Sequence, residues 1–177
     1  GLTIFDISEP DAPRRLAFVP LIYGAERVRV DGRYAYLAGV ANDAGLIVVD
    51  VSDPSRPQRL GSFWDPTCSE AVEVSGSFAY LSHGDKGLEI IDVSEPTKPF
   101  VTSHVDAAGH ARGIHVVGRF AYLANGYTGF RILDVSDAAD IREIAHHPTY
   151  RAMDVRVKGD YAYVADDWAG FKIVDLS

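Results

Sequence analysis

A short phrase occurs five times along the 177-residue chain. It begins with glycine, continues with a mostly apolar run and ends in Asp-x-Ser, as in Gly87-Leu-Glu-Ile-Ile-Asp-Val-Ser94. Its copies begin at Gly1, Gly45, Gly87, Gly129 and Gly170. Successive copies are therefore 44, 42, 42 and 41 residues apart. Self-similarity at such a period indicates a repeat architecture and constrains the fold more than any local propensity.

Each repeat predicts four short β-strands. In the copy from residue 70 to 106, residues 70–74 alternate between polar and apolar, and Ser75-Gly76 follows as a tight hairpin turn. Residues 78–81 form a second strand, and residues 88–93 form a third strand with apolar side chains on both faces. After a turn with two prolines, residues 100–105 form the fourth strand. The sequence therefore predicts an all-β fold.

Several positions keep one residue type in every repeat. A glycine in the first hairpin turn indicates a backbone with positive φ, and a small alanine in the second strand indicates a sheet packed closely against it. An aspartate ends each apolar run, where its carboxylate can accept backbone N–H groups and close the turn. These structural aspartates are Asp6, Asp50, Asp92, Asp134 and Asp175. A residue needed once in every repeat is expected to be structural rather than catalytic. The same reasoning makes the repeated glycines structural turn residues: Gly45, Gly87, Gly129 and Gly170.

Four antiparallel strands in about 42 residues match one blade of a β-propeller. Residues 1–177 are expected to form a single domain of this kind. The whole blades span residues 26–64, 70–106 and 112–148, whereas 151–176 holds only three strands and 1–19 a spare third and fourth strand. We favour an arc cut from a six- to eight-bladed ring. A closed four-bladed ring and a dimer that completes an eight-bladed ring are the alternatives.

The phrases LIVVDVSDP, LEIIDVSEP and FKIVDLS closely resemble the LVIVD repeat. The resemblance covers all four repeats and implies β-propeller blades of the kind found mostly in bacterial and archaeal proteins. It also implies an extracytoplasmic or cell-surface location, since such proteins are often exported. The family provides no catalytic residues to transfer. Because the chain starts inside a repeat, we expect it to be a piece of a longer protein or a processed form.

Composition excludes some partners. Lys and Arg number 17 against 25 Asp and Glu, and the net charge of −8 argues against a nucleic-acid partner. Every apolar run is cut by aspartate too early to span a membrane. Cys68 is the single cysteine, so no intrachain disulfide can form.

Variable residues gather in two sets of loops that a propeller brings to one face. These loops are residues 21–24, 66–69, 107–110 and 148–151, and residues 40–44, 83–86, 125–128 and 166–169. Variation on a constant scaffold is typical of a binding face. The binding-face candidates, including first-strand residues near the channel, are Tyr23, Glu26, Glu70, His83, His110, Arg112, His115, Tyr127, Tyr150, Arg151 and Trp168. Arg29 and Glu73 occupy equivalent positions in adjacent repeats and are expected to pair.

The sequence predicts no metal or other cofactor, and no catalytic residues. The histidines lack metal-binding spacing, and neither a nucleophile elbow nor a phosphate-binding loop is present. We consider two hypotheses for the function of the chain. The first is a non-catalytic scaffold that binds other protein chains in an extracytoplasmic assembly. The alternative is a propeller hydrolase or oxidoreductase with a polar site at the channel, built from Glu26, Glu70, Arg112 and His115; propellers host both kinds of function.

Overall fold

The computed structural model describes residues 1–41 and 44–177. Asn42 and Asp43, in the predicted loop 40–44, lie outside the described residues. The described chain is built from antiparallel sheets that follow one another in sequence order. We refer to four of these sheets as units 1 to 4 and to the first two strands as the N-terminal pair.

The strand bounds agree with the repeat pattern. The N-terminal pair is β1 (Leu2–Asp6) and β2 (Arg14–Val19). Unit 1 is β3 (Ala25–Asp31), β4 (Tyr34–Gly39), β5 (Gly45–Asp50) and β6 (Gln58–Trp64). Unit 2 is β7 (Ala71–Ser75), β8 (Phe78–Ser82), β9 (Leu88–Asp92) and β10 (Phe100–Val105). Unit 3 is β11 (Ile114–Val117), β12 (Phe120–Ala124), β13 (Phe130–Asp134) and β14 (Arg142–His147). Unit 4 is β15 (Asp154–Lys158), β16 (Tyr161–Ala165) and β17 (Phe171–Asp175), with the 3-10 turn η2 (Asp167–Ala169) before β17.

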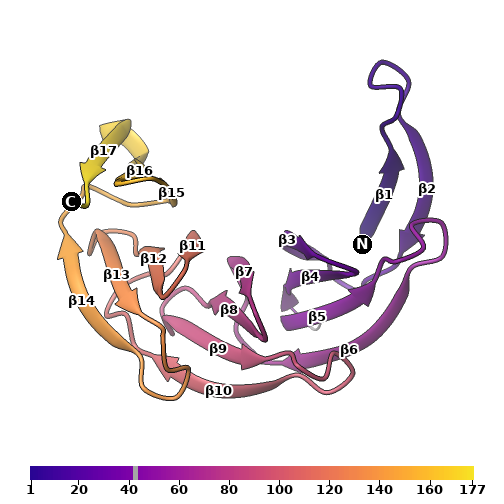
Figure 1. The fold of residues 1–177 in the computed structure, drawn as a ribbon, viewed down its shortest axis with the longest axis horizontal. Helices are drawn as coiled ribbons and strands as arrows, with labels where there is room; N and C mark the ends of the chain where they lie inside the picture. The colour runs from indigo at the N-terminus through magenta and orange to yellow at the C-terminus, as the bar shows by residue number, and fades with distance from the viewer. Residues whose placement is uncertain (42–43) are drawn as a thin grey trace.

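The units form an open arc (Figure 1). The first strands β3, β7, β11 and β15 line its concave side, and the fourth strands β2, β6, β10 and β14 run along its convex side. The N-terminal pair and unit 4 stand apart at the two ends of the arc. The closed four-bladed ring is therefore not the structure of this chain, because residues 15–19 pair with β1 rather than with β17.

Every unit has the same strand register. The aromatic residue that opens the second strand lies opposite the aspartate that ends the third strand, as in Phe78 opposite Asp92. The fourth strand carries a β-bulge at one repeat position, which skips Leu16, Leu60, Thr102 and Ile144. A bulge bends a strand and increases its twist, so the repeated bulge helps the outer strand follow the convex side.

The core consists of layers between neighbouring units. The alanines in the second strand, Ala35, Ala79, Ala121 and Ala162, are at most 1% exposed, as expected where another sheet lies against them. One layer joins unit 1 to unit 2 through Tyr36, Ala38, Leu46, Val48, Ala79, Leu81, Ile91 and Val93. The same positions recur between units 2 and 3 and between units 3 and 4. Each unit thus covers one face of its successor.

The structure shows why the constant turn residues are needed. Gly76 in the first hairpin turn has φ +59°, and Gly87 at the third strand has φ +89°. Asp92 Oδ1 accepts the Ser94 N–H at 2.8 Å, and the aspartates of the other phrases accept the corresponding N–H in the same way. These carboxylates close the turn after the third strand.

Unit 3 lacks the two turn prolines that units 1 and 2 carry after the third strand, having Ala138 and Ile141 instead. Both residues pack on the core layer between units 2 and 3. Ser103 Oγ, on the outer strand of unit 2, donates a hydrogen bond to the Ala138 carbonyl. The turn is therefore held by its neighbour.

Candidate functional site

The two predicted sets of loops meet at one edge of the arc. Gly84 and Ala111 exchange two backbone hydrogen bonds, of 3.1 and 2.9 Å. Gly126 and Ala152 do the same, at 3.0 and 2.9 Å. Each bridge ties a loop between second and third strands to the entry of the next unit. Side chains from different units are therefore placed side by side on a rigid frame. We call the surface that these two sets of loops form the loop face.

The first cluster on the loop face surrounds His110. Its Nδ1 lies 2.8 Å from Asp85 Oδ1, and its Nε2 lies 3.2 Å from Glu70 Oε1. The Arg112 guanidinium is 4.0 Å from Glu70 Oε2. The structure thus brings together three predicted residues, Glu70, His110 and Arg112. Asp85 was not among them, although its position in loop 83–86 is the signal that could have found it.

The His110 cluster is a network of polar contacts rather than a convergent set of metal ligands. Its two carboxylates face opposite nitrogens of one imidazole ring, which can donate to both only when it carries two N–H groups. Glu70, His110 and Arg112 are between 23% and 35% exposed in their side chains. Among the residues that the structure describes, no group of three or more His, Cys, Asp and Glu side chains is arranged to hold a metal ion.

The second cluster on the loop face is aromatic. The rings of Tyr127 and Tyr150 meet edge to face, with centroids 6.2 Å apart and planes at 79°. The Arg151 guanidinium lies 5.2 Å from the Tyr127 ring centre and binds Asp167 Oδ2 at 2.9 Å. The hydrogen bond to Asp167 raises the pKa of Arg151. Tyr127 and Tyr150 remain 69% and 53% exposed, so their ring surfaces are available to a partner.

Asp166 fixes the loop that carries this aromatic cluster. Its carboxylate accepts the N–H groups of Arg151 at 2.7 Å and Tyr150 at 3.1 Å, and it pairs with Lys172 Nζ at 3.0 Å. Burial acts to raise the pKa of Asp166, but the hydrogen bonds outweigh it and lower the pKa to about 2. A buried carboxylate with three donors holds the backbone beneath Tyr150 and Arg151 in place.

His83 does not lie on the loop face, contrary to its prediction as a binding residue. Its side chain is fully buried, with Nε2 3.1 Å from Glu89 Oε2 and Nδ1 3.8 Å from Asp65 Oδ1. Asn125 and Asp166 occupy the equivalent position and are also fully buried. The residue after the second strand points under the loop, and comparison of the three copies could have revealed a shared internal position.

The predicted channel residues join neighbouring first strands. Arg29 Nε lies 2.7 Å from Glu73 Oε1, as the equivalent positions predict. His115 Nδ1 accepts the Val157 N–H at 3.0 Å, and Arg156 donates to the Ile114 carbonyl at 3.1 Å. Burial, with the nearby charge of Arg156, lowers the pKa of His115. These contacts connect the first strands of neighbouring units.

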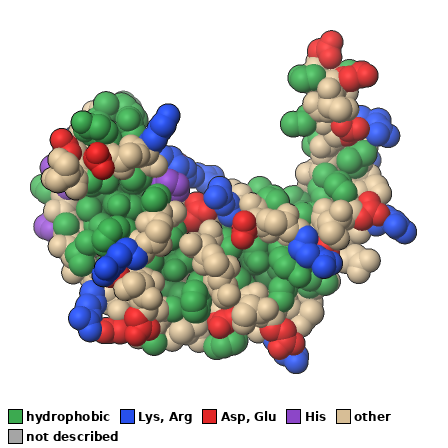
Figure 2. Space-filling model, in the orientation of Figure 1, with side chains coloured by type: hydrophobic (Ala, Val, Ile, Leu, Met, Phe, Trp, Pro, Cys, Tyr) green, Lys and Arg blue, Asp and Glu red, His purple; other side chains and the backbone are tan. Residues whose placement is uncertain are grey.

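The remaining candidates are Glu26, Tyr23 and Trp168. Glu26 is exposed near the start of β3. Tyr23 is 58% exposed in the loop before β3, and Trp168 is 89% exposed in η2. Along the inner edge of the arc, acidic and basic side chains are interspersed rather than separated by sign (Figure 2).

The LVIVD repeat model matches residues 24–65, 68–107, 108–147 and 151–177. The chain belongs to the LVIVD repeat family. These matches follow units 1 to 4 of the LVIVD-repeat chain closely. No curated protein matches it.

Two computationally designed proteins of solved structure are similar in fold to the LVIVD-repeat chain. The designed Ika8 protein aligns with a TM-score of 0.67 and 9% identity, over 84% of this chain and 45% of Ika8. The designed Ika4 protein aligns with a TM-score of 0.67 and 7% identity, over 91% of this chain and 96% of Ika4. The chain thus spans less than half the length of Ika8 but nearly all of Ika4. In the described part of the chain, no helix has the length and apolar character needed to cross a membrane.

Proposed function

We propose that this LVIVD-repeat chain is a non-catalytic scaffold that forms part of a β-propeller ring and binds another protein through its loop face. The observation that carries the proposal is the aromatic cluster of Tyr127, Tyr150 and Arg151. Exposed tyrosines and arginines are enriched where proteins bind one another, and they dominate binding energy there. Asp166 and the backbone bridges described above hold this cluster in place. The cluster therefore loses little conformational entropy when a partner binds.

The His110 cluster extends the proposed surface toward unit 2. Its acidic and basic groups fit a partner that carries charged side chains of both signs. Charges at the rim of an interface influence the association rate and the specificity more than the affinity. The family resemblance supports an extracytoplasmic or cell-surface assembly as the setting.

The alternative of a hydrolase or oxidoreductase has less support. Of the four residues named for it, Glu70 and Arg112 meet beside His110, His115 binds the backbone of unit 4, and Glu26 lies in solvent. On the concave side Arg29 pairs with Glu73, and His115 and Arg156 bind backbone groups of the neighbouring first strands. A scaffold therefore accounts for more of the observed contacts.

A displayed library of random peptides provides a test that needs no known partner. The intact chain selects peptide ligands, and their affinities are measured by calorimetry for the wild type and for Tyr127→Ala/Arg151→Ala. We expect the double variant to bind at least about tenfold more weakly, as for loss of hot-spot residues. Phe100→Ala, on the exposed outer strand of unit 2, is the control and should bind normally. Ligands that bind Tyr127→Ala/Arg151→Ala as tightly as Phe100→Ala would contradict the proposal that the loop face is the binding surface.

A further inference from the structure

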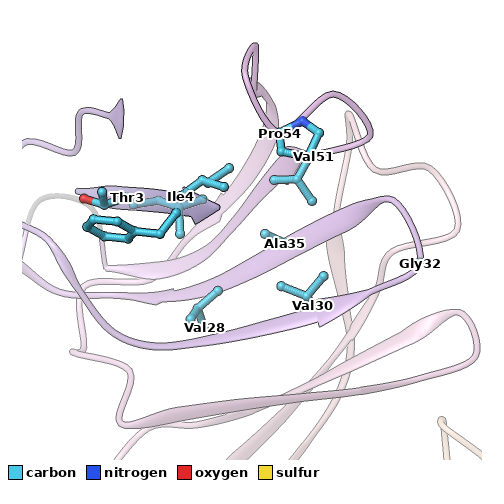
Figure 3. A pocket seen from close by; sticks show the side chains of 10 residues that line it. Thr3, Ile4, Val28, Val30, Gly32, Ala35, Val51 and Pro54 are labelled. Atoms are coloured by element: carbon cyan, nitrogen blue, oxygen red, sulfur yellow. The ribbon is translucent and has the colours of Figure 1, made fainter. Parts of the chain in front are cut away.

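Loop 83–86 contributes Asp85 to the loop face and begins at the fully buried His83. It lies within the arc, away from the apolar groove of about 450 Å³ beside β1 (Figure 3). The His83 N–H donates to the Gly87 carbonyl at 2.8 Å, and the His83 carbonyl accepts the Lys86 N–H at 3.1 Å. The backbone of His83 thus joins the two ends of the loop. A displacement of His83 therefore displaces the loop that stands on it.

The imidazole of His83 lies between two carboxylates. Its Nε2 is 3.1 Å from Glu89 Oε2 on β9, and its Nδ1 is 3.8 Å from Asp65 Oδ1, which comes from unit 1. Asp65 also receives Lys86 Nζ, which lies 3.0 Å from both of its oxygens. Glu89 Oε2 is buried and forms no hydrogen bond within the part of the chain that the structure describes. A protonated His83 supplies the charge that Glu89 needs, because an uncompensated buried carboxylate is costly.

Unit 4 contains the same pair with its charges exchanged. Asp166 is equivalent to His83, and Lys172 is equivalent to Glu89. Lys172 Nζ lies 3.0 Å from Asp166 Oδ2, and the pKa of Asp166 is about 2. Aspartate and lysine both remain charged near neutral pH, so the pair of unit 4 persists there. Histidine changes its charge between about pH 5 and 8, so the pair of unit 2 is an ion pair only while His83 keeps its proton.

A second histidine contacts the same loop from the solvent side. His110 Nδ1 lies 2.8 Å from Asp85 Oδ1, and its Nε2 lies 3.2 Å from Glu70 Oε1. The ring can donate to both carboxylates only when it carries two N–H groups. Arg112 faces the same cluster, 4.0 Å from Glu70 Oε2. A Cβ added at Gly84 would lie 2.9 Å from His110 Cε1, so the His110 ring lies directly against the loop.

Two related contacts at the loop face do not need a second ring proton. Arg151 of the aromatic cluster is equivalent to His110, since each stands one residue before a matching backbone bridge. Arginine keeps its charge throughout the range in which histidine titrates. His104 contacts the Lys86 carbonyl through Nε2, and a neutral imidazole can donate this hydrogen bond. The carboxylate contacts of His83 and His110 thus depend on the second proton of each ring.

We propose that the His110 end of the loop face is sensitive to pH. Protonated His83 and His110 hold loop 83–86 in place, and loss of their protons above neutral pH releases it, while the aromatic cluster keeps its arrangement. The protonated rings make the contacts, so this contribution to local stability is present below the range in which histidine titrates and is lost as the pH rises through it. A partner that contacts both clusters therefore binds more tightly at lower pH, a consequence that rests on the proposed protein-binding function.

Amide hydrogen exchange of the unmodified chain, followed by NMR, tests the proposal without a partner. The N–H groups of Lys86 and Gly87 donate across loop 83–86 and report its order. Those of Ala169 and Gly170 donate at the equivalent places in unit 4 and are the internal control. From about pH 5.5 to about pH 8, we expect the protection factors of the first pair to fall at least about tenfold, as for loss of a charge-assisted contact, and those of the control pair to stay constant. Constant protection in loop 83–86, or an equal fall in unit 4, would overturn the proposal.

Variants that replace the titratable pairs test the assignment to these two histidines. His83→Asp/Glu89→Lys transfers the pair of unit 4 to unit 2, and His110→Arg transfers the arginine of the aromatic cluster. The combined variant should lose the pH dependence, and its persistence there would contradict the assignment. His110→Arg alone changes a partly exposed position and should by itself reduce the fall in protection. His146→Gln, on the exposed outer strand of unit 3, is the matched control and should keep the full change. Because exchange needs no partner, failure of the binding proposal and failure of the pH dependence are separable.

Discussion

Arg29 Nε lies 2.7 Å from Glu73 Oε1, joining the first strands of units 1 and 2 on the concave side of the arc. The Glu73 side chain is only 5% exposed, whereas that of Arg29 is 51% exposed. The pair is therefore unequal: loss of the arginine leaves a nearly buried carboxylate without its counter-ion, whereas loss of the carboxylate leaves an arginine that water can solvate.

Arg29→Met should lower the free energy of unfolding by about 1–2 kcal/mol, because the stranded Glu73 carboxylate loses a charged hydrogen bond. Glu73→Gln in the Arg29→Met background should recover part of the loss, since the neutral amide is cheaper to bury. Denaturant titration measures both. The Arg14–Asp6 pair, with side chains 73% and 32% exposed, is the control, and Arg14→Met should cost less than about 0.5 kcal/mol. Equal losses for the two arginines would show that the burial of Glu73 is immaterial.

Gly87→Ala should destabilise the chain by about 3 kcal/mol or more. Residue 87 has φ +89°, and an added Cβ would lie 2.2 Å from the Val105 carbonyl oxygen, a backbone atom that cannot move aside alone. Gly76→Asn is the matched control, because residue 76 has φ +59° with open space around it and asparagine tolerates this region. It should cost less than about 1 kcal/mol. Thermal unfolding of the two variants decides whether close approach or φ alone requires the glycine.

Asp166→Asn should remove part of the stability in a pH-dependent way. The pKa of Asp166 in the folded chain is about 2, below its ordinary value of 3.8. A lowered pKa stabilises the fold above the unfolded pKa, and this contribution is lost as the pH falls from about 4 to 2. We expect the variant to be less stable by about 1–3 kcal/mol above pH 5, with the difference narrowing below pH 4. Denaturant titrations at a series of pH values measure this, and a constant difference would mean that the carboxylate charge is irrelevant.

Ile90→Ala should cost about 2–5 kcal/mol, because Ile90 is fully buried in the layer between units 2 and 3. The equivalent Ile173 is 60% exposed at the end of the arc, so Ile173→Ala should cost less than about 1 kcal/mol. One chemical change at one repeat position thus has two expected effects. Similar losses at both positions would show that the face of unit 4 is covered in solution.

Strand positions and turns were predictable because the same pattern recurs in every repeat. The Asp-x-Ser turn, the hairpin glycine and the second-strand alanine each have the same structural role in every unit. Comparison of the repeats with one another therefore separates these residues from the variable ones. The Arg29–Glu73 contact followed from the same alignment, because equivalent positions on adjacent first strands must lie near one another.

The loop face was predictable only in part. The sequence named Glu70, His110 and Arg112, but loop conformation decides that Asp85 joins them and that Tyr127 meets Tyr150. It placed His83 on the face because residue 83 opens the variable loop 83–86, whereas the side chain is buried beneath that loop. The two ends of the arc likewise depend on which strands find partners, and strand counting left three arrangements open.

The affinity of peptides selected on the intact chain, measured by calorimetry for the wild type and for Tyr127→Ala/Arg151→Ala, tests the account most directly. A loop face that binds its partner through the aromatic cluster predicts binding at least about tenfold weaker for the double variant. Equal affinities for the wild type and the double variant would contradict the account, since the exposed rings of Tyr127 and Tyr150 would then not form the binding surface.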